Sequence, residues 1–320
     1  MKKAFTLAEV LITLTIIGII AAMVIPSLMA DINEKAFDTQ RKALYARMSQ
    51  AIPAMDKISG FGTLTGTLSS GNTQQSVTAD TAAETFVTEG LSKVIKMNNM
   101  CYSDNITDCN FPDSFYALGG TTQIKLSDIN TLGKFNPTLL KVESSMLGKY
   151  EQLDTKAAAF ETANGESVLV YYNPNCTANM HETVTHYSQS KMCANFVYDL
   201  NGQKAPNTVG KDIGFISVLY SDYPVVVAPN PLPADAAQGT HNNVSKNCKA
   251  QDSESRAPNI DELTSMFYNI KLLNLSTDGY IDYWSNSFAS SSLAWYMSLA
   301  RGSRIPNARN KSASIRCIKR

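Results

Sequence analysis

The hydrophobic pattern opens with one long apolar run. Twenty-one residues from Val10 to Ala30 carry no charge and consist mainly of Leu, Ile, Val and Ala. At about 1.5 Å of rise per residue, this run gives roughly 30 Å of helix, enough to cross the hydrocarbon core of a membrane. The pattern predicts a single membrane-spanning helix. Lys2 and Lys3 precede it and are expected to stay on the cytoplasmic side of the inner membrane, so the rest of the chain would lie outside it.

From Asp31 to about Ser59 the pattern changes to that of an amphipathic helix. Apolar residues recur at spacings of three, four and seven, the period of one helical face, and charged residues fill the other face. We expect the membrane helix to continue to residue 58, with Pro26 and Pro53 kinking or locally breaking it. A coiled-coil partner helix is the alternative. The apolar stripe consists of Phe37, Leu44, Met48, Ala51, Ile52 and Met55.

The middle of the chain combines one helical pattern with several β-prone runs. Residues 78–98 show a helical apolar stripe, whereas the later runs are short, rich in Val, Ile, Tyr and Phe, and separated by turn residues. The pattern predicts an antiparallel sheet laid against the long helix, which makes the fold class α+β. The predicted strands are 167–172, 195–199, 214–220 and 224–227.

Six cysteines without a C-x-x-C pair favour disulfides outside the cytoplasm. Cys101 and Cys109 flank a short polar turn, which predicts a small disulfide loop. Cys176 and Cys193 flank the connection between the first two predicted strands, and we expect them to pair.

Charge and motif content exclude several classes of function. The 28 basic and 28 acidic residues cancel, so no electrostatic footprint for nucleic acid is present. The three histidines match no zinc-protease spacing, and no nucleophile-elbow, phosphate-loop or dinucleotide-binding glycine motif occurs. We therefore expect no enzymatic activity and no catalytic residues.

A polar loop between the second and third predicted strands offers oxygen ligands at intervals. Asp199, Asn201, Asn207 and Asp212 are spread around Gly202, Gly210 and neighbouring turn residues. Calcium favours carboxylate and amide oxygens, so a calcium site is one interpretation, although the spacing is not that of an EF-hand. The alternative is a turn held by Asn and Asp side chains, in which the two glycines supply positive φ. Apart from calcium, no cofactor is expected.

The segment from Lys2 to Glu9 resembles the signal of type IV pilins and type II secretion pseudopilins. In that family a short basic leader and a small residue precede Phe-Thr-Leu-x-Glu at the start of an apolar helix. The resemblance implies cleavage by prepilin peptidase between Ala4 and Phe5 and methylation of the new amine on Phe5. Ala4 stands where the family usually has Gly. Gly18 and Pro26 fall where pilin helices carry a Gly and a kinking Pro.

Glu9 is an acid beside a membrane-spanning run, which costs a few kcal/mol unless the acid is paired or near the interface. In pilins this acid meets the N-terminal amine of a neighbouring subunit during assembly. The resemblance therefore implies an assembly role for Glu9. An ordinary signal anchor with an interfacial acid is the alternative.

The last quarter of the chain differs from the rest in composition and in the motifs that it contains. Residues 229–243 are rich in Pro, Ala, Gly and Asn, which predicts a linker. Residues 244–320 resemble a C-type-lectin-like module, with Ala257 for Leu and Asn259 for Thr as departures. The resemblance implies a Cys248–Cys317 disulfide. Trp284 and Trp295 are expected as core anchors, with a role as sugar-stacking platforms as the alternative. Asn259 is expected to cap a helix. The matching elements are Cys248, 256–263, 283–287, 294–296 and 314–320.

Together these patterns predict a leader (1–4), a membrane and assembly helix (5–58), a pilin-like domain (59–228), a linker (229–243) and a lectin-like module (244–320). The predicted function is that of a pilin-like, minor subunit of a type IV pilus or secretion pseudopilus. Its predicted partners are prepilin peptidase, other pilin subunits, the assembly machinery and a carbohydrate or protein surface. The expected location is the inner membrane before assembly, then a surface pilus or a periplasmic pseudopilus. The alternative is a membrane-anchored adhesin that forms no filament.

Overall fold

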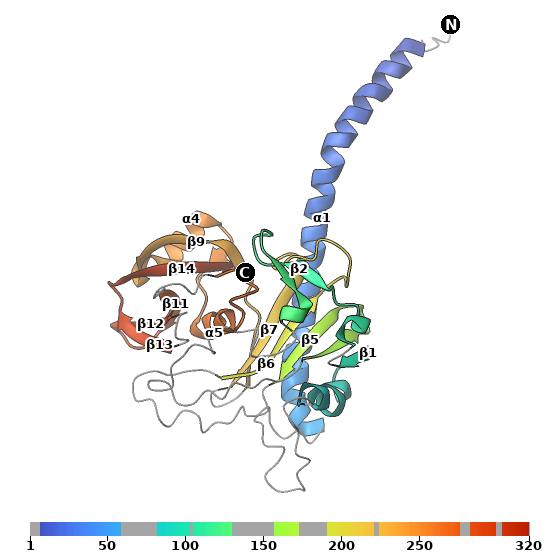
Figure 1. The fold of residues 1–320 in the computed structure, drawn as a ribbon. Helices are drawn as coiled ribbons and strands as arrows, with labels where there is room; N and C mark the ends of the chain where they lie inside the picture. Colours follow the sequence, from blue (N-terminus) through green and yellow to red (C-terminus); the bar gives the residue numbers. More distant parts are fainter. Residues whose placement is uncertain are drawn as a thin grey trace. The chain divides into compact units, whose positions relative to one another are not determined.

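The computed structural model describes residues 7–58, 82–102, 105–129, 157–172, 191–220, 224–275, 282–298 and 303–319. The chain divides into two units, residues 1–44 and 45–320, which are considered separately. An apolar helix at the N-terminus and two main sheets, the first antiparallel and the second antiparallel except for the parallel pair β11–β14, give the α+β mixture that the sequence predicts (Figure 1).

Helix α1 (Leu7–Ile58) is continuous over 52 residues. It passes through Pro26 and Pro53, so the local break that these prolines predict does not occur. A proline removes one hydrogen bond from a helix, and the many remaining bonds of a long helix can keep it intact. Within residues 45–320 the predicted stripe is buried: Met48, Ala51, Ile52 and Met55 are at most 6% exposed.

The helical turns after α1 are shorter than predicted. They comprise α2 (Ala82–Thr85), a π-helical turn η1 (Phe86–Gly90) and a 3-10 turn η2 (Leu91–Lys93). Their apolar residues are buried as expected, and the ring of Phe86 stacks on Tyr172 at 4.2 Å between centroids.

The first sheet has six strands in the order β1-β4-β5-β6-β7-β8, and every neighbouring pair is antiparallel. All four predicted strands are confirmed as β5 to β8. Strands β1 and β4 were not predicted, because β1 is an edge strand with polar, exposed positions and Phe160 is the one large apolar residue of β4. The bounds are β1 (Met97–Tyr102), β4 (Ala158–Thr162), β5 (Ser167–Tyr172), β6 (Lys191–Asp199), β7 (Ile213–Tyr220) and β8 (Pro224–Val227).

A small hairpin lies in the stretch that showed no clear pattern in the sequence. It consists of β2 (Ser114–Tyr116) and β3 (Gln123–Lys125) and is flanked by the 3-10 turns η3 (Ile106–Cys109) and η4 (Leu126–Asp128). Phe115 of β2 is buried and meets Phe111 edge to face.

The C-terminal region forms a second sheet in the order β10-β14-β11-β12-β13, and β9 pairs with β14. Helices α4 and α5 precede its main strands. The bounds are β9 (Pro231–Thr240), η6 (His241–Asn243), α4 (Val244–Gln251), β10 (Ser255–Arg256), α5 (Ile260–Tyr268), β11 (Asp282–Phe288), β12 (Leu293–Ser298), β13 (Ser303–Ala308) and β14 (Ser312–Lys319).

Residues 231–240 are a strand, whereas composition predicted a linker over 229–243. Strand β9 is antiparallel to β14, with Thr240 opposite Ser312 and Pro231 opposite Ile318. Pro231 and Pro233 fit there because β9 pairs only with β14, and an edge strand tolerates prolines, which lack the N–H group. Composition gave the wrong prediction because closely spaced prolines are typical of loops and also occur in edge strands.

The two sheets share one apolar core within residues 45–320. Leu263, Met266 and Phe267 of α5 lie in the same cluster of buried residues as Val197 of β6 and Phe215 of β7. A second cluster is confined to the C-terminal region and includes Trp284, Ile315 and the Cys248–Cys317 disulfide.

A buried polar network joins the first sheet to helix α5 beside the shared core. The Nδ2 of Asn195 donates to the Oδ1 of Asn269 at 2.8 Å. The hydroxyl of Ser217 donates to the Oδ1 of Asn195 at 2.7 Å, and the hydroxyl of Ser265 donates to that of Ser217 at 2.7 Å. All four side chains are fully buried, so each depends on the others for hydrogen bonds.

Candidate functional site

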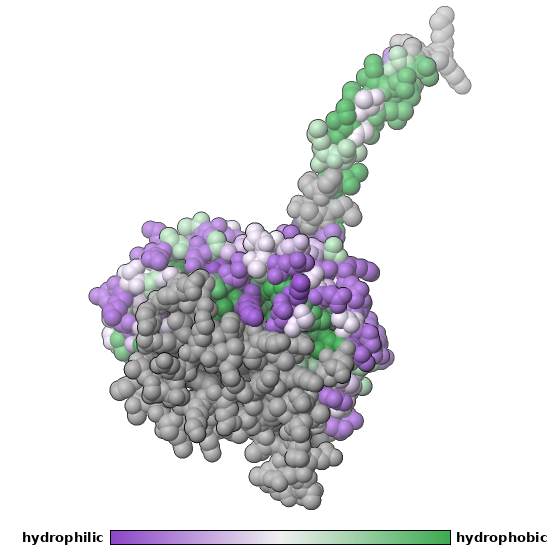
Figure 2. Space-filling view, viewed as in Figure 1, coloured by the Kyte–Doolittle hydropathy of each residue, from purple (hydrophilic) through white to green (hydrophobic). Residues whose placement is uncertain are grey.

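The N-terminal part of α1 presents apolar side chains on every face. Within the described residues, Leu7–Ile25 is the one stretch long and apolar enough to cross a membrane, and none of it is buried within the chain. Figure 2 shows this stretch as nearly continuous apolar surface. A helix that is apolar all round is stable only when something outside the chain, lipid or another subunit, covers it.

The predicted assembly residues lie on this helix, and the predicted cleavage residues do not fall within the described part of the chain. Glu9 is the acid in the first turn of α1, and the exposed Gly18 has no neighbouring atom within 4 Å of the position a Cβ would occupy. Pro26 lies within the continuous helix. Ala4 and Phe5 lie outside the described residues.

The C-terminal part of α1 is fixed to the first sheet by polar contacts that sequence patterns did not reveal. The guanidinium of Arg47 pairs with the carboxylate of Glu166, which lies between β4 and β5 and also accepts a hydrogen bond from the hydroxyl of Thr162. The hydroxyl of Tyr45 donates to the backbone oxygen of Val226 on β8 at 3.1 Å. Partners more than a hundred residues apart leave no local signal.

The polar loop that connects β6 to β7 begins at Asp199, the last residue of β6, and ends at Asp212, one residue before β7. The backbone N–H of Leu200 donates to the oxygen of Asp212, which closes the base of the loop. Gly202 and Gly210 have φ angles of 69° and 87°, so the predicted positive φ at both glycines is confirmed.

The carboxylate of Asp212 is fully buried and organises the second half of the loop. Its Oδ2 accepts a hydrogen bond from the backbone N–H of Asn207 at 2.8 Å, and its Oδ1 accepts one from the N–H of Thr208 at 2.9 Å. Asn207 has a φ angle of 46°, a conformation that Asn tolerates better than most residues. These contacts are those of the structural turn that the sequence offered as an alternative to a calcium site.

Three other oxygens of the loop are buried without a hydrogen-bond partner. They are the Oδ2 of Asp199 and the Oδ1 atoms of Asn201 and Asn207. Both amides direct their nitrogens to the loop backbone, since the Nδ2 of Asn201 donates to the oxygen of Ala205 and the Nδ2 of Asn207 to that of Gln203, each at 3.2 Å. Each unsatisfied buried oxygen costs roughly 1–3 kcal/mol.

The electrostatics of the loop disfavour the charged form of the Asp199 carboxyl group. Burial raises the pKa of Asp199 to about 8, and repulsion from Asp212 acts in the same direction. The backbone N–H groups of Asn201 and Gly202 partly oppose this rise in the pKa. Among the described residues, no three His, Cys, Asp or Glu side chains gather as a metal site, so a cation here would need amide or backbone oxygens as well.

Two of the three predicted disulfides are present in the structure. Cys101 pairs with Cys109 and Cys248 pairs with Cys317. Cys193 is also disulfide-bonded, but its predicted partner, Cys176, lies outside the described residues.

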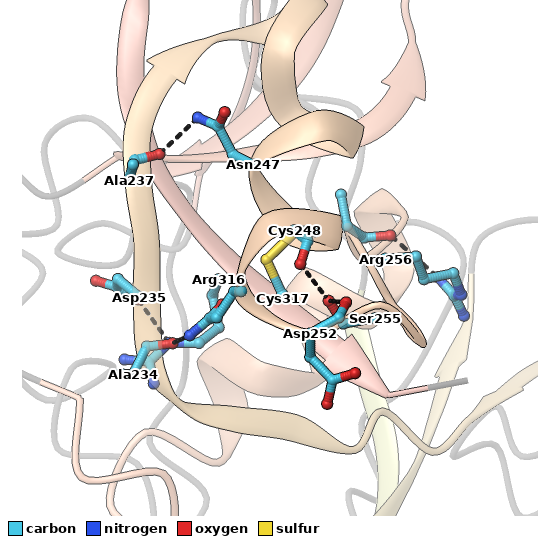
Figure 3. Close-up of a disulfide and its surroundings, with 12 residues drawn as sticks. Ala234, Asp235, Ala237, Asn247, Cys248, Asp252, Ser255, Arg256, Arg316 and Cys317 are labelled. Carbon is cyan, nitrogen blue, oxygen red and sulfur yellow. Dashed lines mark hydrogen bonds and ion pairs between the residues drawn. A yellow bond between two sulfur atoms is a disulfide. The ribbon is translucent and has the colours of Figure 1, made fainter.

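The Cys248–Cys317 disulfide joins α4 to β14 at the centre of the C-terminal region (Figure 3). The neighbouring Arg316 pairs through its Nε with the carboxylate of Asp235 on β9 at 2.6 Å, and its NH1 donates to the oxygen of Leu232. On the other side, the hydroxyl of Ser255 donates to the oxygen of Cys248 at 2.7 Å. These contacts connect β9, the first strand of the C-terminal region, to β14, its last strand.

The two tryptophans of this region differ in environment. Trp284 is 1% exposed and belongs to the core cluster, so its predicted role as a core anchor is confirmed. Trp295 is only half-buried and lies outside that cluster, so its predicted role as a core anchor is wrong. It shares a face of β12 with Met297, because successive side chains of a strand alternate. The predicted cap is also present: Asn259 and Glu262 form a reciprocal capping box at the start of α5.

Comparison with known proteins identifies one feature, at the N-terminus. Residues 1–25 match the family described as Prokaryotic N-terminal methylation motif. No curated protein matches the chain. The matched segment includes Glu9 and the whole exposed apolar stretch of α1, Leu7–Ile25, which fits anchoring in a membrane. The chain thus has the N-terminus of a type IV pilin-like or pseudopilin-like precursor.

Proposed function

We propose that this protein is a minor subunit of a type IV pilus or of a type II secretion pseudopilus. Prepilin peptidase cuts it between Ala4 and Phe5, and the N-terminal half of α1 then packs among the helices of neighbouring subunits. The C-terminal region, from β9 onwards, is displayed for contact with a surface. This function requires no chemistry from the chain, and we propose neither catalysis nor nucleic-acid binding.

One observation carries the proposal: the segment that matches the methylation motif, residues 1–25, contains an apolar helical stretch that is not buried within its own chain. A simple membrane anchor requires the apolar stretch but not the motif. A subunit processed by prepilin peptidase requires both, and it also requires an acid near the new amine. Glu9, four residues after Phe5, meets this requirement, because an ion pair with a neighbouring subunit's amine removes most of the cost of placing a carboxylate in lipid.

The test separates processing from assembly. We expect Glu9→Ala to be cleaved normally and to be lost from sheared fibres, because the variant keeps the peptidase site but lacks the acid that pairs between subunits. Glu9→Asp is the matched variant and should restore part of the incorporation. Cleavage is measured by N-terminal sequencing and incorporation by immunoblotting of the sheared fraction.

An Ala4→Asp variant tests the cleavage site independently. A charged residue in place of the small one should leave the leader attached and keep the protein in the membrane fraction. Normal processing of Ala4→Asp, or wild-type incorporation of Glu9→Ala, would contradict the proposal.

A second candidate function is that of a membrane-anchored adhesin without a filament, whose C-terminal region binds a carbohydrate or protein surface. It is favoured by the exposed aromatic ring of Phe288, with the guanidinium of Arg309 over it at 4.9 Å. The proposed lectin-like fold of the region does not by itself imply sugar binding.

A glycan array probed with the 320-residue chain in detergent distinguishes the two functions. Binding that Phe288→Ala abolishes, combined with wild-type binding in a strain that cannot assemble fibres, would support the adhesin. Absence of binding together with loss of fibres in cells that lack the protein would support the subunit.

A further inference from the structure

Arg309 differs from the other arginines of the described C-terminal region because it has no carboxylate partner. Arg256, Arg304 and Arg316 each pair with an Asp or Glu side chain, at 2.6 to 2.7 Å. Arg309 forms no ion pair with any residue that the structure describes, and its Nε is buried without a hydrogen-bond partner. A half-buried positive charge without a counterion is costly, so this one needs a cause.

The guanidinium of Arg309 is held instead by an aromatic ring and an amide. It lies over the ring of Phe288, 4.9 Å from the centroid, and its NH2 donates to the Oδ1 of Asn242 at 2.7 Å. The ring of His241 meets the same Phe288 edge to face, with 5.0 Å between centroids. These contacts hold the planar charged group in place before any ligand arrives, which lowers the entropy lost on binding.

Arg309 lies where three turns meet at one end of the second sheet. The turns are residues 240–243 between β9 and α4, 288–293 between β11 and β12, and 308–312 between β13 and β14. Backbone pairing joins the second turn to the third and the third to the first. None of the three contains Asp or Glu, whereas the third contains both Arg309 and Lys311. Positive charge without its own counterions favours an anionic ligand.

The aromatic ring beside the charge limits which anion fits. Phe288 is 57% exposed, and it is the one large apolar side chain of the described C-terminal region that is this exposed. The core of a protein–protein interface needs several such residues, and an anionic lipid surface is bound by clusters of roughly four to eight Lys or Arg. A sugar that carries a carboxylate has one acidic group and an apolar C–H face, so it matches both side chains.

We propose that Phe288 and Arg309 form a binding site for a glycan that carries a carboxylate, on a sialic acid or uronic acid residue. The guanidinium of Arg309 donates hydrogen bonds to the carboxylate, and the sugar ring packs against the exposed part of Phe288. This proposal rests on the proposed display of the C-terminal region for contact with a surface, and it names the chemistry of that surface.

The experiment uses the 320-residue chain in a detergent without a sugar head group and measures binding to immobilised glycans by biolayer interferometry. Sialyllactose and trigalacturonate are the probes, which separate sialic from uronic acids, and lactose is the neutral control. We expect saturable binding to at least one acidic probe and at least about 10-fold weaker binding to lactose, because hydrogen bonds to a carboxylate are charge-assisted. Raising NaCl from about 50 mM to about 500 mM should weaken the binding.

Two variants locate the site. Arg309→Met keeps part of the apolar stem but removes the charge, and it should weaken binding of the acidic probe by at least about 10-fold. Arg309→Lys should restore only part of the affinity, since an ammonium group lacks the planar fork. Phe288→Ala changes a largely exposed ring and should weaken binding by about 3-fold or more, which keeps the test informative if Arg309→Met fails to fold. Lys125→Met is the matched control: it removes one exposed positive charge on β3 and should bind like the wild type.

The proposal is overturned if the wild type binds neither acidic probe, or binds lactose as tightly as the acidic probes. It is also overturned if a folded Arg309→Met or Phe288→Ala binds the acidic probe as tightly as the wild type. Equally tight binding of a triglutamate peptide would overturn the assignment to a glycan. Binding in detergent requires no fibre, and Glu9→Ala tests assembly in sheared fibres, so failure of this proposal is distinguishable from failure of the proposed function.

Discussion

The two ends of helix α1 are chemically similar and structurally opposite. Ile17 lies in a stretch where no residue is buried, whereas Ile52 is 1% exposed in the core of residues 45–320. What differs is the arrangement of apolar residues: all round the helix at one end, on a single stripe at the other. An apolar stripe can be covered by one sheet, but an all-round apolar surface needs a surrounding medium. The arrangement of apolar residues around the helix, not their number, therefore decides whether the rest of the same chain can cover them.

The largest expected effect comes from removing the same side chain at each end. Ile52→Ala should lower the free energy of unfolding by about 2–5 kcal/mol, since it leaves a cavity in a packed core. Ile17→Ala should change it by less than about 0.5 kcal/mol. Denaturant unfolding in detergent, followed by circular dichroism, measures both. A loss of similar size in the two variants would show that the N-terminal stretch is packed against its own chain.

Introducing a charge into the exposed apolar stretch Leu7–Ile25 tests whether a membrane surrounds it. Ile17→Lys should disfavour insertion by about 2.5–3.5 kcal/mol, the cost of a lysine at the centre of a membrane helix. The fraction of protein recovered with the membrane pellet after an alkaline carbonate wash measures this. Thr39→Lys, an exposed position on the same helix, is the control and should be recovered like the wild type. Full recovery of Ile17→Lys would argue against a membrane environment for this stretch.

Two ion pairs on α1 extend the comparison to polar contacts. Glu166→Gln leaves Arg47 without its charged partner, in a place where the Glu166 side chain is only 6% exposed, and should cost about 1–3 kcal/mol. Lys42→Gln breaks the exposed pair between Asp38 and Lys42 without removing the contact of Asp38 with Arg41, and should cost about 0.5 kcal/mol or less. The same unfolding assay at low and high salt measures both losses. Equal costs would mean that burial contributes little to the Arg47–Glu166 pair.

The smallest expected effect is a pH dependence in the C-terminal region. Burial, aided by the charge of Arg309, lowers the pKa of His241, although a backbone contact with Ser285 acts in the opposite direction. The pKa of His241 is lower in the folded protein than the unfolded value of about 6.5. The contribution of the neutral imidazole to folding stability is therefore complete above about pH 6.5. It is lost as the pH falls from about 6.5 through the folded pKa.

The His241→Phe variant should reduce the loss of stability between about pH 7.5 and pH 5.5, measured by chemical unfolding at each pH. The Arg309→Met variant should reduce it less, since burial is the main cause. An unchanged pH dependence in His241→Phe would show that other groups control it.

Local patterns predicted much of this fold because the elements concerned are local. The stripe of α1, the strands β5 to β8, the positive φ at Gly202 and Gly210, and the cap at Asn259 each depend on residues within a few positions of one another. Strand β9 was mistaken for a linker because its strand character comes from β14, some eighty residues later. The Arg47–Glu166 pair and the Asn195–Asn269 contact could not be predicted for the same reason.

The candidate sites follow the same division. The methylation motif lies on contiguous residues, and its family match agrees with the sequence-based prediction. The polar loop residues were also named from the sequence, with a turn and a calcium site as alternatives. The structure adds which of the loop oxygens have hydrogen-bond donors.

The Asn195–Asn269 contact bears on how such a protein can change during evolution. A C-terminal region that makes no contacts with the first sheet can be exchanged for another by recombination. Here a replacement lacking the equivalents of Asn269 and Ser265 would leave Asn195 and Ser217 of the sheet buried with unmet hydrogen bonds. It would also uncover the apolar residues that α5 covers. Exchange of residues 231–320 alone is therefore expected to lower the stability of the first sheet, whereas substitutions at their surface leave these contacts intact.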